Sequence, residues 1–443
     1  MLFSKVDLRR LIIPLIIEQF LSVAMGLIDT AMVSGGGPAA ISGVHLADNI
    51  NVLLINIFAA LATGGAVVVA QYIGRKDREQ AGLAAKQLLY ISLFIALVVM
   101  ILVLPITHWL LKTIFGNTEP EVLQQAGTYF FITVFSFPFL ALYNSSAALM
   151  RTTGNSKIPT FTALLMNLVN IGGNAVLIYG LDMGVTGAAI STVLCRGAGA
   201  IAILIILHKP TPMLTIQNLL RPIWKKDMIT RILRIGVPNG IENSLFQLGK
   251  IIILRLVATL GASVIAANSV ANSLSSVIAI PANAIGLSII TVVGRCVGAK
   301  EFKQAKTYTK SLIQLAFVAL FVTSLLVTLL LPVLLNNVFQ LTGEEYTVTR
   351  NMVWMYAVAS ILIWPFSFGL PNALRAAGDA TFTMSVSLIS MVVFRILFSY
   401  LLTLSFHMGI YGIWIAMFID WIARAIAFLH RIKSGKWLEK QVI

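Results

Sequence analysis

Charged residues are scarce in this sequence, and this scarcity excludes an ordinary soluble protein. Only 11% of the 443 residues are charged and 58% are hydrophobic, whereas a soluble globular protein carries about 25% charged residues. Cysteine is nearly absent too. Cys195 and Cys296 are the only two, and both lie in or beside apolar segments, so no disulfide framework or cysteine metal site is expected.

The side-chain sets that catalysis needs are also missing. Five histidines are scattered without ligand spacing. No paired acids, nucleophile with its base or His/Asp metal cluster is found, and no Gly-x-x-x-x-Gly-Lys-Ser/Thr phosphate loop occurs. The sequence therefore does not favour a membrane-embedded enzyme or a nucleotide-driven pump, and we expect no cofactor.

Long apolar runs recur along the whole chain instead. A run of about 20 residues crosses ~30 Å of hydrocarbon as a helix. The runs predict an all-α membrane protein with twelve transmembrane helices. The predicted spans are 11–33, 50–73, 84–107, 127–150, 157–180, 186–208, 232–257, 271–294, 308–334, 351–374, 380–404 and 409–431. The first run is too long for a cleaved signal peptide, the other interpretation of its basic flank.

The formal charge of +15 is concentrated in short loops. In a soluble protein such a charge would suggest nucleic acid, but here lysine and arginine sort to alternate loops, so no nucleic-acid partner is expected. The positive-inside rule then places both termini in the cytoplasm of a multi-pass protein in the plasma (inner) membrane of a bacterium. The basic loops hold Lys5, Arg9 and Arg10; Arg75, Lys76 and Arg78; Arg151 and Lys157; Arg221, Lys225 and Lys226; Lys300, Lys303 and Lys306; Arg375; and Arg431, Lys433 and Lys436.

Self-comparison reveals an internal repeat. Pro14 and Glu18 recur 224 positions later as Pro238 and Glu242. The same shift relates Gly37 to Gly261, Gly74 to Gly298, Gln80–Ala81 to Gln304–Ala305, Arg151 to Arg375 and Gly154 to Gly378; after one inserted residue, Gly184 and Gly187 match Gly409 and Gly412. Each half has an even number of helices, so the halves are expected to be parallel repeats. We predict two six-helix bundles, 1–208 and 232–443, joined by a cytoplasmic linker at 209–231 that contains an interfacial helix.

Polar residues inside the spans are the candidates for function, because a buried ionisable group in a membrane is costly. Asp29 lies in the first span. The fifth carries Asn167, Asn170 and Asn174 at spacings of three and four residues, which share one helical face. Carboxylate and amide oxygens suit a hard monovalent cation. The alternatives are that Asp29 ends its helix or pairs with a basic side chain, and that the asparagines only bond helices together.

Several segments resemble the multidrug and toxic compound extrusion (MATE) transporters along the whole chain. The first matching segment is Pro14 followed by Asp29 in Ile28-Asp29-Thr30-Ala31-Met32-Val33. The second is the repeated turn, Leu149-Met150-Arg151-Thr152-Thr153-Gly154 and Ala373-Leu374-Arg375-Ala376-Ala377-Gly378. The third is Gly184-Val185-Thr186-Gly187-Ala188-Ala189. The resemblance implies an antiporter that exports drugs or toxic organic compounds, cationic or amphipathic, in exchange for H⁺ or Na⁺.

The family resemblance also implies an ion site, and this site matches Asp29, Asn170, Asn174 and Thr192 here. One branch has a second aspartate where this chain has Asn174, so a proton relay through that acid is not expected. No metal is implied beyond Na⁺ at this site. The expected partners are a small-molecule substrate and the lipid bilayer, and we expect a monomer.

A second group of residues predicts a substrate or further coupling site: Glu18, Glu242 and Lys250. The two glutamates could instead be symmetry-related contacts that fix the proline-containing helix starts. Lys250 is interpreted as neutralising Glu242 or as meeting an anionic group on the substrate, which keeps open a flippase for a lipid-linked or anionic substrate. Asp420 is expected to form a salt bridge with Arg424 and Arg395. Where the best-known drug-exporting branch has acids, this chain has Phe246 and Trp364, which puts an ion site in the second half in doubt.

Overall fold

Helices make up the structure, a computed structural model that describes residues 2–33, 35, 37–116, 118–216, 219, 223–440 and 442–443. Within these ranges no strand occurs. In the described part of the chain, nine helices are long and apolar enough to cross a membrane, and two bent pairs add two more spans. The remaining span is α8, which is 33 residues long but less apolar because it carries several polar residues. The predicted fold of twelve transmembrane helices is confirmed.

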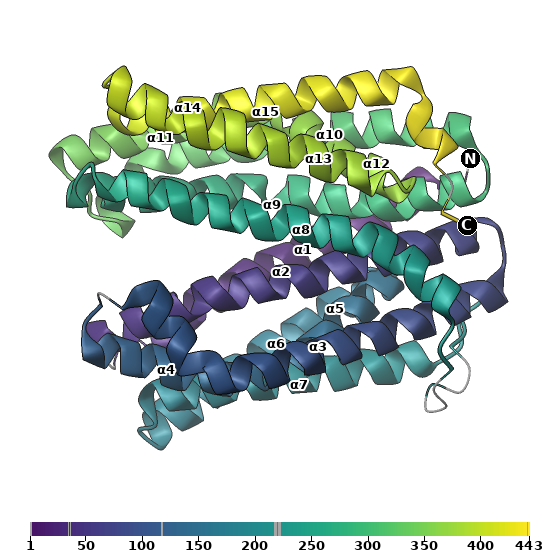
Figure 1. Cartoon of the computed structure of the whole chain (residues 1–443), viewed down its shortest axis with the longest axis horizontal. Helices are drawn as coiled ribbons and strands as arrows, with labels where there is room; N and C mark the ends of the chain where they lie inside the picture. The colour runs from purple at the N-terminus through teal and green to yellow at the C-terminus, as the bar shows by residue number, and fades with distance from the viewer. Residues whose placement is uncertain are drawn as a thin grey trace. The chain divides into compact units, whose positions relative to one another are not determined.

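The helices of the first half precede those of the second along the chain, and the second half is divided into more elements (Figure 1). The first half holds α1 (Lys5–Val33), α2 (Pro38–Gly74), α3 (Arg78–Phe115), α4 (Pro120–Val134), α5 (Phe137–Thr152), α6 (Lys157–Asn174), the π-helical η2 (Ala175–Gly180) and α7 (Gly184–His208). The second holds α8 (Lys226–Ala258), α9 (Ala262–Gly298), α10 (Phe302–Val333), η3 (Leu334–Val338), α11 (Gly343–Leu362), η4 (Pro365–Gly369), α12 (Leu370–Ala376), α13 (Ala380–Ser390), η5 (Met391–Leu397), α14 (Phe398–Tyr400), η6 (Leu401–Ser405), α15 (Gly409–Ser434) and the 3₁₀ turn η7 (Lys436–Glu439).

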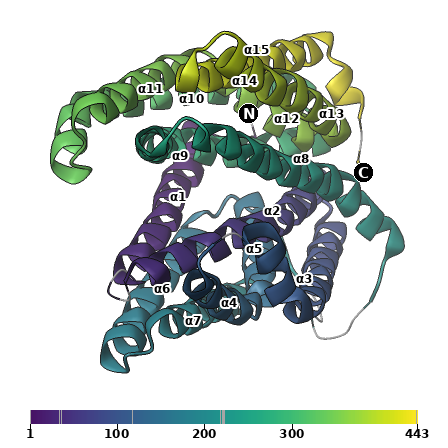
Figure 2. The same ribbon diagram turned by 60° about the vertical axis from the view of Figure 1, so that its left-hand side comes forward.

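In the first half, α2 packs against α3, α4 and α5, while α6 packs against α1 and α7 (Figure 2). In the second half, α9 packs against α10, α11 and α12. Their apolar cores are separate clusters, one around Phe58, Phe130 and Phe137 and the other around Tyr356 and Trp414. Each half therefore has the interior of an independent bundle.

The fourth span of each half is bent at a proline. The α4–α5 pair turns by 54° and the pair α11 with Pro365–Ala376 turns by 60°. Pro138 lies at the start of α5 and Pro365 at the start of η4. Proline removes a backbone donor and prevents a straight continuation of the helix, so the repeat extends to the irregular parts of the fold.

Repeated glycines mark turns that need a left-handed backbone. Gly37 and Gly261, the residues just before α2 and α9, have φ values of 87° and 105°. Gly154 and Gly378, which follow α5 and α12, have φ values of 83° and 98°. Only glycine adopts such angles without strain. These two matches of the repeat are therefore explained by backbone geometry.

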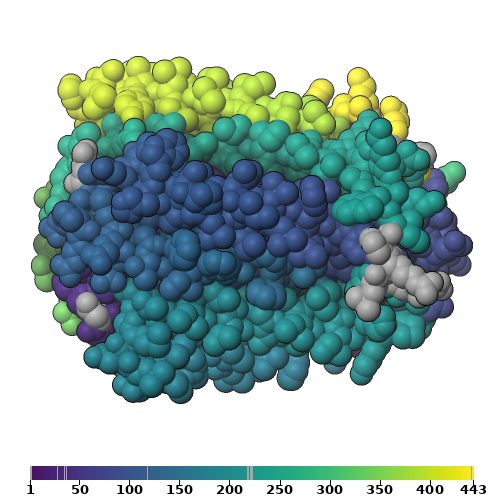
Figure 3. All heavy atoms as spheres, turned by 60° about the horizontal axis from the view of Figure 1, so that its bottom comes forward, coloured from purple at the N-terminus to yellow at the C-terminus, as the bar shows by residue number. Residues whose placement is uncertain are grey.

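Large apolar side chains cover much of the outside. On α3, Phe94, Ile101, Leu102 and Trp109 are more than half exposed, and α3 lies on the outer face of its bundle in the space-filling view (Figure 3). In water such a surface would be a liability. In a bilayer it is the surface that contacts lipid.

The chain divides into compact units at a different place from the predicted linker. One unit comprises Phe3–Gly240 together with Ile443, and the other comprises Ile241–Val442 together with Leu2. The start of α8 stays with the first unit because Arg231 donates a 2.6 Å hydrogen bond to the hydroxyl of Tyr72. Residues 217, 218 and 220–222 of the predicted 209–231 linker, including the basic Arg221 and Pro222, lie outside the described residues.

Candidate functional site

Asp29 meets the polar face of α6 inside the first bundle. Asp29 is near the end of α1 and half-buried, whereas Asn174, at the last position of α6, is completely buried. The side-chain amide of Asn174 donates a 2.7 Å hydrogen bond to the Asp29 carboxylate. The structure thus brings together two residues that lie far apart in the sequence and that the resemblance assigns to one ion site.

Asn170 extends this cluster by one helical turn. Its Oδ1 accepts a 3.5 Å hydrogen bond from the same Asn174 amide. Asn174 Oδ1 is buried and has no hydrogen-bond partner among the described residues, and Asn170 also interacts with the Asp29 carboxylate. A buried polar atom without a partner costs about 1–3 kcal/mol, and an unpaired carbonyl oxygen beside a carboxylate is a suitable ligand for a small cation.

The other predicted polar residues differ in their surroundings. Asn167 donates to the carbonyl of Ala163 on its own helix, as a packing asparagine does. Thr192 on α7 donates to the carbonyl of Ala188, and the described residues give it no hydrogen bond to Asp29. The neighbouring Ser191 ties α7 to α6 through a 2.9 Å bond to the Asn170 carbonyl.

Two charged residues near this cluster escaped the sequence analysis. Asp48 on α2 and Arg196 on α7 both interact electrostatically with Asp29, and Asp48 also accepts a 3.4 Å hydrogen bond from Asn51. The predicted second span began at residue 50, which left Asp48 in a loop. Gly37-Pro38 is a helix-start signal that would have extended this helix, because proline is favoured in the first turn. Arg196 lies inside the predicted span 186–208, and the sequence does not show that it approaches Asp29.

Glu18 and Glu242 form equivalent salt bridges in the two bundles. Glu18 on α1 pairs with Arg151 on α5. Glu242 on α8 pairs with Arg375 on α12 at 2.7 Å and also accepts a 2.8 Å hydrogen bond from Ser387. The repeat that relates the glutamates therefore relates their arginine partners too. This geometry agrees with the alternative that the glutamates fix the helix starts.

Lys250 does not neutralise Glu242, which corrects one interpretation of the sequence. Eight residues separate them, or about 12 Å along α8, and the Glu242 carboxylate is occupied by Arg375. Lys250 lies instead over the ring of Phe246, with its Nζ 5.3 Å from the ring centre. The predicted salt bridge of Asp420 is confirmed, with Arg424 at 2.8 Å and Arg395 at 3.7 Å.

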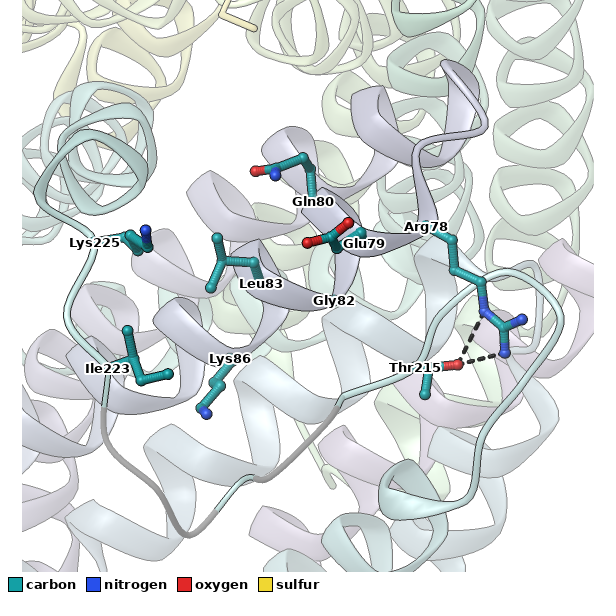
Figure 4. Close-up of a pocket in the computed structure, with 9 residues that line it drawn as sticks. All are labelled: Arg78, Glu79, Gln80, Gly82, Leu83, Lys86, Thr215, Ile223 and Lys225. Carbon is teal, nitrogen blue, oxygen red and sulfur yellow. Dashed lines mark hydrogen bonds between the residues drawn. The ribbon is translucent and has the colours of Figure 1, made fainter.

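A cavity of about 850 Å³ lies where the linker meets the start of α3 (Figure 4). Its residues are Arg78, Glu79, Gln80, Gly82, Leu83, Lys86, Thr215, Ile223 and Lys225. Arg78 Nε donates a 3.0 Å hydrogen bond to Thr215, and the backbone of Lys225 donates to Gln87 at 3.1 Å. The cavity contains no predicted site residue, and its bonds hold the linker on α3.

Comparison with known proteins identifies relatives over the full chain. The model of the MatE family matches residues 14–176 and again 238–401, so its two matches begin 224 residues apart, the shift found by self-comparison. An uncharacterized transporter of Bacillus subtilis, YisQ, is 28% identical over 96% of this chain and 94% of its own length. A probable multidrug resistance protein of Thermotoga maritima, NorM, is 27% identical over 99% of this chain and 94% of its own. The crystal structure of a MATE protein in its bent conformation superimposes with a TM-score of 0.87 at 21% identity, covering 98% of this chain and 96% of that one.

Proposed function

The chain belongs to the MatE family of multidrug efflux transporters, and we propose that it is a secondary antiporter that exports amphipathic organic compounds in exchange for Na⁺ or H⁺. It is a multi-pass plasma-membrane protein and not an enzyme. The coupling ion, the site and the class of substrate are the proposed part.

The cluster of Asp29, Asn170 and Asn174 is the observation that carries this proposal. It combines a carboxylate, a bonded amide and an unpaired buried carbonyl oxygen. An ionised carboxylate within a membrane bundle needs a counter-charge. A proton or Na⁺ supplies it, and the oxygens of the cluster provide ligands for either ion.

Charge balance supports a single coupling cation. With Asp29 and Asp48 ionised, Arg196 protonated and His45 neutral, the titratable groups that interact in this part of the bundle carry a net charge of −1. One monovalent cation neutralises it. Because the ion binds one arrangement of α1 and α6 more tightly than another, its binding shifts the equilibrium between conformations, and this shift is the basis of coupling to substrate export.

Vesicle transport under imposed gradients tests the proposal. Purified protein in proteoliposomes receives an inward-directed sodium gradient at equal pH, or a pH gradient without sodium, and movement of ethidium and of taurocholate is followed. We expect one of the two gradients to drive at least one of these substrates against its concentration gradient. Equal movement with and without both gradients would show a uniporter and contradict antiport.

Cysteine labelling tests the proposed orientation. We expect Lys225→Cys in the linker to be protected from an impermeant maleimide added to intact cells, because basic loops stay in the cytoplasm. Glu119→Cys, in the connection before α4, should react. The natural Cys195 and Cys296 are both buried, so they give little background. Labelling at position 225 but not at position 119 would show the opposite orientation and contradict the proposed one.

A flippase for a lipid-linked or anionic substrate is the second candidate function. The observation that favours it is the concentration of positive charge around Phe246 in the second bundle. A flippase and an antiporter of soluble compounds differ in where the anion comes from, and the experiment in the next subsection separates the two sources.

A further inference from the structure

Three cations surround the ring of Phe246 within the second bundle. Lys250 Nζ lies 5.3 Å from the ring centre, and the guanidinium carbons of Arg395 and Arg424 lie at 5.1 and 5.6 Å. They come from α8, η5 and α15, three separate segments. Each contact between a cation and an aromatic face contributes about 0.5–2 kcal/mol. The ring therefore stabilises the three cations near one another but does not neutralise their charge.

Asp420 is the carboxylate that contacts this group, and its single negative charge does not neutralise three cations. Its Oδ2 bonds Arg424 at 2.8 Å and lies 3.7 Å from Arg395, while its Oδ1 accepts a 2.6 Å hydrogen bond from Ser390. Glu242 is committed to Arg375. With the three cations protonated and Asp420 ionised, the group keeps a net charge of +2.

Unused hydrogen-bond donors accompany the excess charge. The Nε atoms of Arg395 and Arg424 are buried and lack a partner within the part of the chain that the structure describes. The Arg424 side chain is only 3% exposed, whereas Lys250 is exposed. Because isolated charge in a membrane bundle is costly, a surplus of cations points to a ligand that brings negative charge.

We propose that Lys250, Arg395 and Arg424 form an anion-binding site for the acidic group of an amphipathic substrate: a sulfonate, carboxylate or phosphate. Arg424 also lies over the ring of Phe368, which packs edge-on against Trp421, so an aromatic surface adjoins the charges and suits the apolar part. An organic cation would be repelled by the same charges. The inference rests on the proposed transport function and names its substrate class.

Equilibrium binding of radiolabelled taurocholate, a permanent sulfonate, to the full chain in phosphatidylcholine nanodiscs tests the site. Lys250→Gln should weaken binding about ten- to a hundredfold, because a hydrogen bond to a charged group contributes about 1.5–3 kcal/mol. Lys250→Arg should stay within about threefold of wild type. Arg255→Gln, which removes an exposed cation of the same helix outside the group, is the matched control and should bind normally.

Further binding and transport measurements identify the source of the anion and separate this site from ion coupling. Competition by dioctanoyl phosphatidylglycerol would identify a lipid source for the anion, and its absence would identify a soluble organic anion. Asp29→Asn should lose gradient-driven transport and still bind taurocholate in a way that Lys250→Gln weakens, so failure of coupling is distinguishable from failure of this site. Binding of ethidium but not taurocholate by wild type, or undiminished taurocholate binding by Lys250→Gln, would overturn the proposal.

Discussion

Asp29→Asn abolishes gradient-driven transport in proteoliposomes while the protein remains folded and inserted: this is the largest functional effect we expect. Asparagine keeps the size and one oxygen of the side chain but removes the negative charge that a coupling cation would neutralise. The Asn174 amide donates to this carboxylate at 2.7 Å, and the substituted side chain can still accept that bond. The variant should therefore resemble the neutralised state and lose its response to either ion gradient.

Two asparagines provide graded controls for this experiment. Asn174→Ala removes one neutral oxygen and should weaken the apparent affinity for the ion by about two- to tenfold, since a neutral hydrogen-bonding group contributes about 0.5–1.5 kcal/mol. Asn167→Ala, on the same helix, should have little effect because the Asn167 amide donates to the Ala163 carbonyl of its own helix. Undiminished dependence on the ion gradient in Asp29→Asn would eliminate Asp29 as the coupling residue and make Asp48 the next candidate.

Arg375→Gln should give the largest loss of stability. Arg375 and Glu242 are nearly buried and paired at 2.7 Å, and removing one partner of such a pair leaves an uncompensated charge that costs about 3–5 kcal/mol. Ser387 would remain as a hydrogen-bond donor to the Glu242 carboxylate, but a hydroxyl does not replace the charge. Thermal unfolding of the purified protein in detergent, followed by intrinsic fluorescence, measures the loss.

The double variant Glu242→Gln/Arg375→Gln tests whether charge is the cause. It removes both charges and should recover most of the lost stability, since no buried charge then lacks a partner. Arg151→Gln offers a parallel in the first bundle, where Arg151 pairs with Glu18. Single and double variants of equal stability would mean that the arginine contributes through packing rather than through the ion pair.

Much of the fold was predictable because the segments that insert into a membrane are recognisable from their amino-acid composition. Apolar runs of spanning length identify helices in any context, since backbone polar groups must be satisfied inside lipid. The internal repeat was also predictable, because residues such as Gly37 and Gly261 are kept in both halves. Both have a left-handed backbone, with φ values of 87° and 105°. The polar face of Asn170 and Asn174 followed from helical spacing, although their ion-coupling role and that of Thr192 remain predictions.

The contributions of Asp48, Arg196 and the arginine partners of the glutamates could not be predicted in the same way. Asp48 was missed because the position where a helix begins outside the apolar run is weakly encoded. The sequence placed Glu242 and Lys250 on one helix and left open whether Lys250 neutralises Glu242 or meets an anionic group of the substrate. Arg375 takes the glutamate instead, from a segment more than 130 residues away, so the lysine is left beside Phe246.

The sequence by itself determined the class of protein, the number of spans and the duplicated architecture, because these depend on composition, local periodicity and self-similarity. Only the tertiary structure decided which charges neutralise one another. Ion pairing depends on distances of a few ångströms between side chains of different helices, and helical periodicity does not specify those distances. For that reason a set of cations that was scattered along the sequence, Lys250, Arg395 and Arg424, became in the folded bundle a single concentration of positive charge around one aromatic ring.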